Sequence, residues 1–131
     1  MRRNLSIIPA QLKLIAVLPL MFLSGAAAAQ DAEAGKKVFN QCRACHVADQ
    51  PTNRVGPHLV GLFGRQAGAV DGFKYSDALK NSGVTWDEGT LGKYLKDPKG
   101  FIPGNKMTFA GIRKDEDLEN LVAYLKSETS K

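Results

Sequence analysis

Residues 42–46 of this 131-residue chain read Cys42-Arg43-Ala44-Cys45-His46. A Cys-x-x-Cys-His run carries two thiols three positions apart on one short turn, with an imidazole directly after them. Each thiol can add to one vinyl group of a porphyrin, which leaves the imidazole beneath the iron. The motif therefore predicts one haem c per chain, bound covalently through Cys42 and Cys45, with His46 as the proximal iron ligand.

Three other interpretations of the motif fit the surrounding sequence less well. A redox-active disulfide normally opens a helix in a βαβ unit, but no alternating strand pattern surrounds Cys42. A zinc site would need Cys42, Cys45, His46 and His58 as donors, whereas structural zinc sites normally join two separated ligand pairs. A plain disulfide would leave His46 unexplained. The haem interpretation accounts for all three residues of the motif.

Residues 1–29 have the three-part composition of an export signal. The basic start contains Arg2, Arg3 and Lys13. The apolar middle is Leu14–Leu23, and the small-residue cleavage site is Ala27–Ala29. A membrane-spanning helix needs about 20 apolar residues, so we expect cleavage after Ala29 rather than a retained anchor. The prediction is a soluble periplasmic protein with a single domain, 30–131.

The charge of the chain falls when this signal is removed. The full sequence has a formal net charge of +5, but the signal contains three of the basic residues and none of the acidic ones. The remaining 15 Lys and Arg against 13 Asp and Glu give +2, which argues against nucleic-acid binding. So short a domain has a thin apolar core, to which a bound porphyrin would add.

The mature chain is predicted to consist of helices joined by one long loop. Acids at the start and lysines further along predict a helix over 31–41. Glycines and prolines without any period predict an ordered loop over 47–72. A short helix is expected over 76–82, and a capping box at 85–88 is expected to open another helix that Pro98 ends. Apolar residues at i, i+3, i+4 and i+7 predict a final helix over 114–126.

The sixth coordination position of the iron decides between two classes of function. An open position invites oxygen, peroxide or carbon monoxide, as in a gas-binding protein or a weak peroxidase, whereas a closed one limits the iron to electron transfer. Met1 and Met21 leave with the signal, so Met107 is the only thioether of the mature chain. It lies in the aperiodic, partly apolar segment 101–111, which could cover a haem face. The alternatives are that Met107 fills a core gap or that His58 is the sixth ligand.

The mature chain resembles the class I c-type cytochromes, in particular the group of mitochondrial cytochrome c and bacterial cytochrome c2. The resemblance extends well beyond residues 42–46. The further matching motifs are Gly56-Pro57-x-Leu59, Gly61-Leu-Phe-Gly-Arg65, Phe73-x-Tyr75, Trp86, Tyr94-Leu95, Ile102-Pro103-Gly104-x-Lys106-Met107-x-Phe109-Ala110-Gly111 and Leu121-x-Ala123-Tyr124-Leu125.

The resemblance implies an all-α, small cytochrome c fold with helices and ordered loops around the haem. It implies that Met107 is the distal iron ligand and that the Pro57 carbonyl accepts the ring N–H of His46. Tyr94 and Phe109 would line the Met107 side. Three side chains would hold or neutralise a haem propionate: Arg65, Tyr75 and Trp86.

The family also packs its first helix against its last. By this resemblance, Gly35 and Phe39 would contact Leu121 and Tyr124, and a glycine at such a crossing lets two backbones approach closely.

The chain departs from the family pattern at three positions. Leu79 and His58 stand where many members have Asn, and Asn105 stands where they have Thr. Leu79 and Asn105 are near the polar network around the methionine, so the hydrogen bonds of Met107 depend on them.

A thioether ligand favours ferrous iron, and an apolar shell disfavours the more charged ferric state, so we expect a high-potential electron carrier rather than an enzyme. The expected carrier is a monomer, peripheral to the membrane, that moves single electrons between membrane redox complexes. The donor would be a cytochrome bc1-type complex, and the acceptor a cytochrome oxidase or a photosynthetic reaction centre. Acidic surfaces of these partners would meet cations near the haem, namely Arg43, Lys99, Lys106, Arg113 and Lys114.

Overall fold

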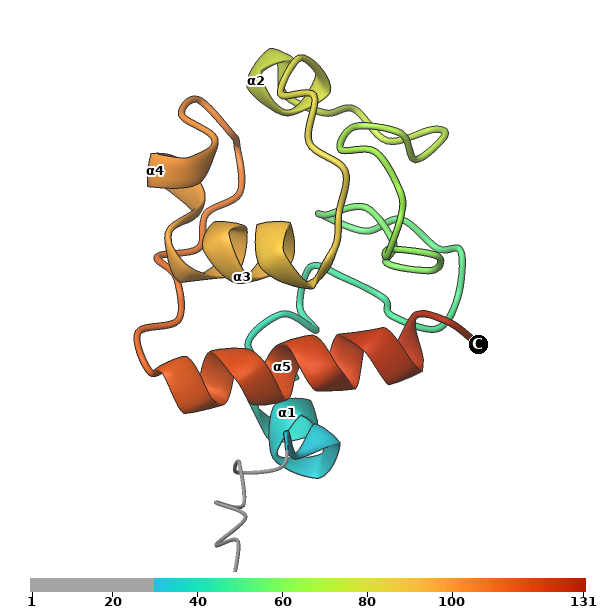
Figure 1. Cartoon of the computed structure of the whole chain (residues 1–131). Coiled ribbons are helices and arrows are strands. Elements are labelled where there is room, and N and C mark those ends of the chain that lie inside the picture. The colour runs from blue at the N-terminus through green and yellow to red at the C-terminus, as the bar shows by residue number, and fades with distance from the viewer. Residues whose placement is uncertain (1–29) are drawn as a thin grey trace, which may run out of the picture.

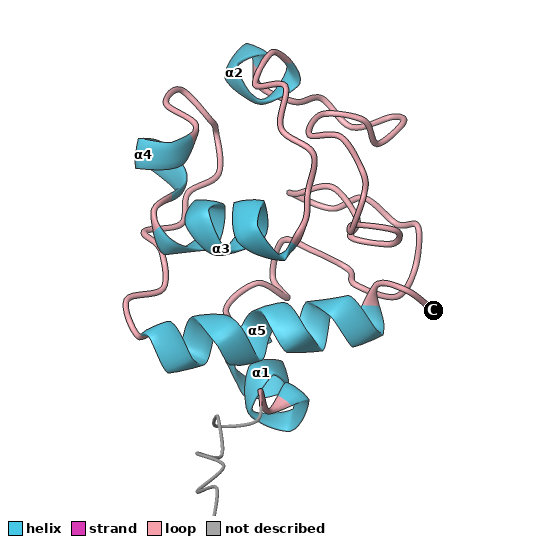
Figure 2. Cartoon of the chain, viewed as in Figure 1, coloured by secondary structure: helices cyan, strands magenta, loops and turns pink. Residues whose placement is uncertain are grey.

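A computed structural model describes residues 30–131 of the chain (Figure 1). Within this range the fold is all-α, as predicted: five helices are joined by loops, and no strand forms (Figure 2). The helices are α1 (Ala32–Phe39), α2 (Asp77–Lys80), α3 (Glu88–Lys96), α4 (Pro98–Phe101) and α5 (Asp115–Glu128). The predicted export signal and its cleavage site lie outside the described residues.

None of the helices within residues 30–131 is both long enough and apolar enough to cross a bilayer.

Helices α1 and α5 pack across each other at the base of the molecule (Figure 1). The Asp31 carboxylate begins α1 by accepting the backbone N–H groups of Glu33 and Ala34, which would otherwise have no partner in the first turn. A Cβ on Gly35 would lie 1.9 Å from the carbonyl oxygen of Asn120, so only glycine allows this close crossing. The rings of Phe39 and Tyr124 pack with their centroids 5.2 Å apart. The expected packing of the first and last helices is thus observed.

The start of α3 differs from the prediction. Thr85 was expected to cap this helix, but Asp87 is the N-cap, and its reciprocal capping partner is Thr90. The reason is that residues 85 and 86 pair with the preceding loop. Trp86 exchanges backbone hydrogen bonds with Gly64 and Arg65, and its side chain is buried. This pairing keeps the backbone extended through Trp86, so the helix begins only after it.

Pro98 ends α3 as predicted, but it also begins α4, a short helix that the sequence pattern did not indicate. Proline is well suited to the first helical position because it lacks the N–H that would have no partner there. The Asp97 carboxylate caps α4 by accepting the N–H of Gly100. The chain then turns back beside α3, where the Ile112 N–H donates to the Leu95 carbonyl. A Cβ on Gly111 would lie 2.2 Å from the Lys96 carbonyl oxygen, so this return also depends on a glycine.

Residues 47–72 form the predicted ordered loop, without a helix or strand. Together with the turn after α1, this loop makes one half of the molecule, and α2, α3 and α4 with their connections make the other (Figure 1). The buried core runs between the halves and includes Leu62, Trp86, Tyr94 and Leu121. The predicted short helix after Phe73 is also observed as α2, which Ser76 caps.

Candidate haem site

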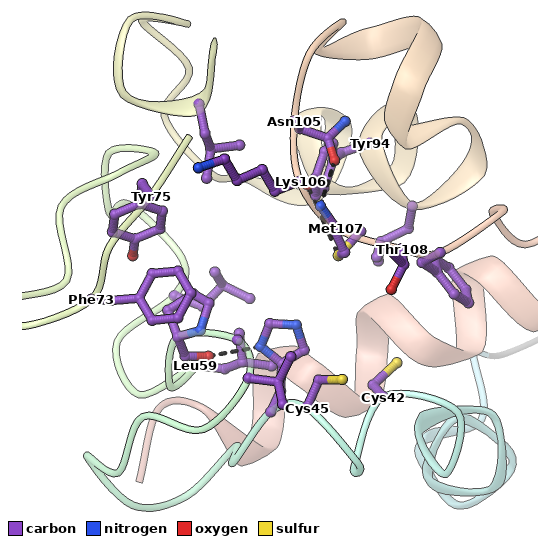
Figure 3. A pocket seen from close by; sticks show the side chains of 18 of the residues that line it. Cys42, Cys45, Leu59, Phe73, Tyr75, Tyr94, Asn105, Lys106, Met107 and Thr108 are labelled. Atoms are coloured by element: carbon purple, nitrogen blue, oxygen red, sulfur yellow. Dashed lines mark hydrogen bonds between the residues drawn. The ribbon is translucent and has the colours of Figure 1, made fainter. Parts of the chain in front are cut away.

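A cavity of about 320 Å³ lies between the two halves of the molecule. Its lining contains every cofactor-binding and iron-ligating residue predicted from the sequence: Cys42, Cys45, His46, Pro57, Arg65, Tyr75, Trp86, Tyr94, Met107 and Phe109. Figure 3 shows the two thiols on one side of this cavity and Met107 on the other. The cavity therefore joins segments that are more than 60 residues apart in the sequence.

The imidazole of His46 has a defined orientation. Its Nδ1 lies 2.7 Å from the carbonyl oxygen of Pro57. A carbonyl only accepts hydrogen bonds, so Nδ1 must carry the ring proton, and Nε2 keeps its lone pair for a metal. The Gly56 backbone packs directly on the ring, because a Cβ there would lie 2.3 Å from Cε1 of His46. This arrangement meets the requirement for a neutral, oriented histidine ligand.

Burial influences the ionisation of the residues on this side of the cavity. It lowers the pKa of His46, and nearby Arg65 acts in the same direction, while the hydrogen bond to Pro57 opposes them. Burial, assisted by neighbouring Cys45, raises the pKa of the Cys42 thiol to about 11. A disulfide oxidoreductase needs a thiol pKa below the ordinary value, so this environment does not fit that alternative. Both cysteines are free thiols in the structure.

The zinc alternative is also not supported by the geometry. Within residues 30–131, no three His, Cys, Asp or Glu side chains gather as a metal-binding group. His58 does not line the cavity, and its Nδ1 accepts the Val60 N–H at 3.2 Å. Met107 does line the cavity, so His58 does not replace it as the candidate sixth ligand.

Met107 is the half-buried sulfur donor on the side of the cavity opposite the thiols (Figure 3). The phenol of Tyr94 donates a hydrogen bond to its sulfur, with 3.9 Å between Oη and Sδ. Burial raises the pKa of Tyr94 to about 12, so the phenol keeps its proton at neutral pH. The ring of Tyr94 is held against Trp86, with 5.0 Å between the centroids. Tyr94 is thus a fixed donor to the sulfur.

The guanidinium group of Arg65 also lines the cavity, and one of its N–H donors has no hydrogen-bond partner within residues 30–131. Its Nη1 donates to the Val60 carbonyl at 3.0 Å, but its Nε is buried and has no hydrogen-bond partner among the described residues. The Tyr75 hydroxyl accepts the Val70 N–H at 3.2 Å and retains its own proton for donation. Buried polar groups are rarely left unpaired. An anionic propionate beside Arg65 and Tyr75 would satisfy both, so the residues present fit a haem.

Two of the three departures from the family pattern, Leu79 and Asn105, have different consequences. Leu79 lines the cavity with an apolar side chain, so it offers no donor there. Asn105 is buried, and its side chain makes three hydrogen bonds. The polar network on the Met107 side is therefore built from Tyr94 and Asn105.

The predicted docking cations are all exposed, but they differ in their distance from the cavity. Lys106 lines the cavity, whereas Arg43, Lys99, Arg113 and Lys114 do not. The ion pairs formed within residues 30–131 are Lys96–Asp115, Lys126–Glu88 and Lys131–Glu128. None of the five predicted docking cations takes part in them.

Two exposed residues of the cavity lining were not predicted from the sequence. Lys74 is exposed and lines the same cavity as Lys106, and its position between Phe73 and Tyr75 of a matching motif was an available signal. Val55 also lines the cavity and is 79 % exposed. Nothing in the local sequence marked this valine, because its exposure depends on the path of the long loop.

The Cytochrome c family profile matches residues 32–129, which is nearly all of the described chain. The chain belongs to the cytochrome c family. It is 55% identical over 96 residues to cytochrome c-550 of Nitrobacter winogradskyi, a match covering 72% of this chain and 88% of that protein. It is 52% identical over 101 residues to cytochrome c2 of Blastochloris viridis, covering 76% of this chain and 80% of that protein.

A solved structure agrees with this family assignment. Cytochrome cH from Methylobacterium extorquens superposes with a TM-score of 0.70 at 48% identity, covering 74% of this chain and 98% of that one. Cytochromes of the c2 type are electron carriers and not enzymes, so this cytochrome is a c2-like electron carrier. With its Cys42 and Cys45 pair, membership of the family implies covalently bound haem c.

Proposed function

We propose that this cytochrome is a high-potential, one-electron carrier whose haem iron is bound by His46 and Met107. The observation that carries the proposal is that an imidazole with a free Nε2 and a thioether line the same cavity as the two cysteines. A thioether favours ferrous iron, so this ligand pair raises the reduction potential relative to two imidazoles.

The residues of the cavity have distinct parts in this proposal. When bound, haem c supplies reversible one-electron chemistry at its iron. Cys42 and Cys45 hold the porphyrin covalently, and the Pro57 carbonyl keeps the His46 ring oriented. The Tyr94 phenol donates to the Met107 sulfur. The hydrogen bond withdraws electron density from this donor atom, which further disfavours ferric iron.

The proposed setting of electron transfer is the periplasm. Residues 1–29 would direct export and be removed, and the domain 30–131 would be soluble and monomeric. It would carry electrons from a cytochrome bc1-type complex to a cytochrome oxidase or a photosynthetic reaction centre. Support for docking on acidic partner surfaces comes from Lys74 and Lys106, which are exposed at the cavity mouth.

The Met107→Ala variant tests the iron ligation and separates a carrier from a gas-binding haem protein or a peroxidase. We expect the reduced wild-type protein to bind little carbon monoxide near neutral pH, because the thioether occupies the sixth position. The variant should bind carbon monoxide rapidly and have a lower reduction potential. Rapid, complete binding by the wild type, or an unchanged potential in the variant, would contradict the proposed ligation.

Charge reversal at the cavity mouth tests the docking surface. We expect Lys74→Glu and Lys106→Glu to slow electron transfer to an isolated acceptor complex about tenfold each at low salt. The difference should shrink at 0.1 M salt, where the Debye length is about 10 Å. Lys96→Glu is the matched control, because Lys96 pairs with Asp115 and does not line the cavity. Equal slowing by all three variants would refute docking at this mouth.

A further inference from the structure

We propose that Asn105 positions Met107: its buried side-chain amide holds the 105–107 segment in the conformation that directs the Met107 sulfur toward the iron. This inference rests on the proposed ligation by Met107. Asn105 would act through the backbone and would not itself contact the iron.

The amide of Asn105 uses both of its N–H groups and its oxygen. Its Nδ2 donates to the carbonyl oxygens of Pro98 and Ile102, at 2.8 Å each. Its Oδ1 accepts the backbone N–H of Met107 at 3.0 Å, a bond drawn as a dashed line in Figure 3. The residue is only 6% exposed. One side chain thus joins the Met107 backbone to both ends of the α4 turn.

The Met107 segment has little other backbone support. No backbone-to-backbone hydrogen bond is donated by residues 106–111 in the described chain; the last one before them is from Asn105 to Ile102, and the next is from Ile112 to Leu95. Lys106 and Thr108 on either side of Met107 are exposed. Regular secondary structure therefore does not determine the position of Met107, and its backbone N–H is held by the Asn105 side chain.

The chemistry of an amide suits this attachment better than that of a hydroxyl. The threonine that many family members have here offers one O–H donor. It could satisfy one of the two carbonyls that Asn105 joins, and the other would lose its partner. A buried polar group without its partner is costly. Asparagine can therefore bind the Met107 backbone and both carbonyl groups at once, whereas threonine cannot donate to both carbonyl groups.

The experiment compares the haem-loaded wild type with Asn105→Ala and Asn105→Thr. Cyanide binding to the ferric protein measures how often the sixth position opens, and the weak far-red absorption band of thioether-ligated ferric haem reports the bond itself. With three hydrogen bonds lost, the apparent cyanide affinity should rise about 100-fold in the alanine variant. In the threonine variant it should rise about tenfold because part of the network remains.

Asn120→Ala is the matched control, because Asn120 is also a buried asparagine, at 8% exposure. Its Oδ1 accepts the Asp31 N–H at 2.8 Å, at the start of α1 and away from Met107. This variant should lose stability to denaturant but keep the wild-type cyanide affinity. An equal rise in cyanide affinity in Asn120→Ala would mean that Asn105 acts only through global stability, and it would overturn the inference.

The outcomes for the inference and for the proposed function are distinguishable. A wild-type protein without the far-red band would refute ligation by Met107. If the wild type has the band but the cyanide affinities of the Asn105 variants lie within about twofold of the wild-type affinity, positioning by Asn105 is refuted. Ligation by Met107 would still stand. If Asn105→Ala does not accumulate with haem, Asn105→Thr decides by the same criterion.

Discussion

Replacing Tyr94 by phenylalanine changes the hydrogen bonding of the Met107 sulfur by removing a single oxygen atom. The Tyr94→Phe variant removes the hydroxyl that donates to the Met107 sulfur at 3.9 Å, while the ring keeps its place against Trp86, 5.0 Å away. We expect a lower reduction potential, because a sulfur without this hydrogen bond is a better donor to ferric iron. No buried donor is left unpaired by the change, so the loss of stability should be small.

The size of the effect follows from the strength of the lost bond. A neutral intramolecular hydrogen bond contributes about 0.5–1.5 kcal/mol, and a thioether is a weak acceptor, so about 0.5–1 kcal/mol is an upper range here. A one-electron potential changes by 59 mV for each tenfold change in equilibrium constant, or about 1.4 kcal/mol. The predicted decrease is therefore about 20–40 mV.

Spectroelectrochemical titration at neutral pH measures this decrease directly. Tyr124→Phe is the control, because it removes the same atom from a tyrosine that packs on Phe39 between α1 and α5. The control should leave the potential within a few millivolts of the wild type. A Tyr94→Phe potential equal to or above that of the wild type, with the thioether still bound, would show that the hydrogen bond does not tune the iron.

Three further predictions concern stability. Gly56→Ala places a Cβ 2.3 Å from Cε1 of His46, and the strain should lower the free energy of unfolding of the haem protein in urea by about 2–3 kcal/mol; a change below about 0.5 kcal/mol would exclude the close contact. Gly35→Ala brings a Cβ to 1.9 Å from the Asn120 carbonyl oxygen and should destabilise the α1–α5 crossing by about 2–4 kcal/mol in the same assay, whereas an unchanged urea midpoint would argue against that crossing. The pKa of Tyr94 is raised from 10.0 to about 12, so its contribution to stability is complete below pH 10 and is lost as the pH rises toward 12. The free energy of unfolding should therefore fall less between pH 10 and 12 in Tyr94→Phe than in the wild type. Parallel pH dependences of the two free energies would contradict the raised pKa.

The sequence was sufficient to predict features that depend on local pattern. The apolar period of the last helix predicted α5 to within two residues at its end, because spacing at i, i+3, i+4 and i+7 is a property of the helix itself. The cofactor-binding and iron-ligating residues that line the cavity were also predictable, since each of them belongs to a motif that the family resemblance covers. Their roles as iron ligands and propionate partners remain proposals.

Features that depend on distant contacts could not be predicted in this way. Thr85 has the local pattern of an N-cap, but the helix does not begin there because Trp86 pairs with Gly64 and Arg65, which are distant in the sequence. The network of Asn105 depends on α4, whose carbonyl groups accept from its amide. That short helix has no period of its own, so neither its existence nor the use of its carbonyls could be inferred from spacing.

The central claim is that the iron is bound between His46 and Met107. Proton NMR of the reduced, haem-loaded protein tests it most directly, because the methyl group of an axial methionine lies against the haem face, where the ring current shifts its resonance far upfield. The account predicts one such methyl resonance in the wild type and its loss in Met107→Ala. Its absence from the wild type, or its persistence in the variant, would contradict the account.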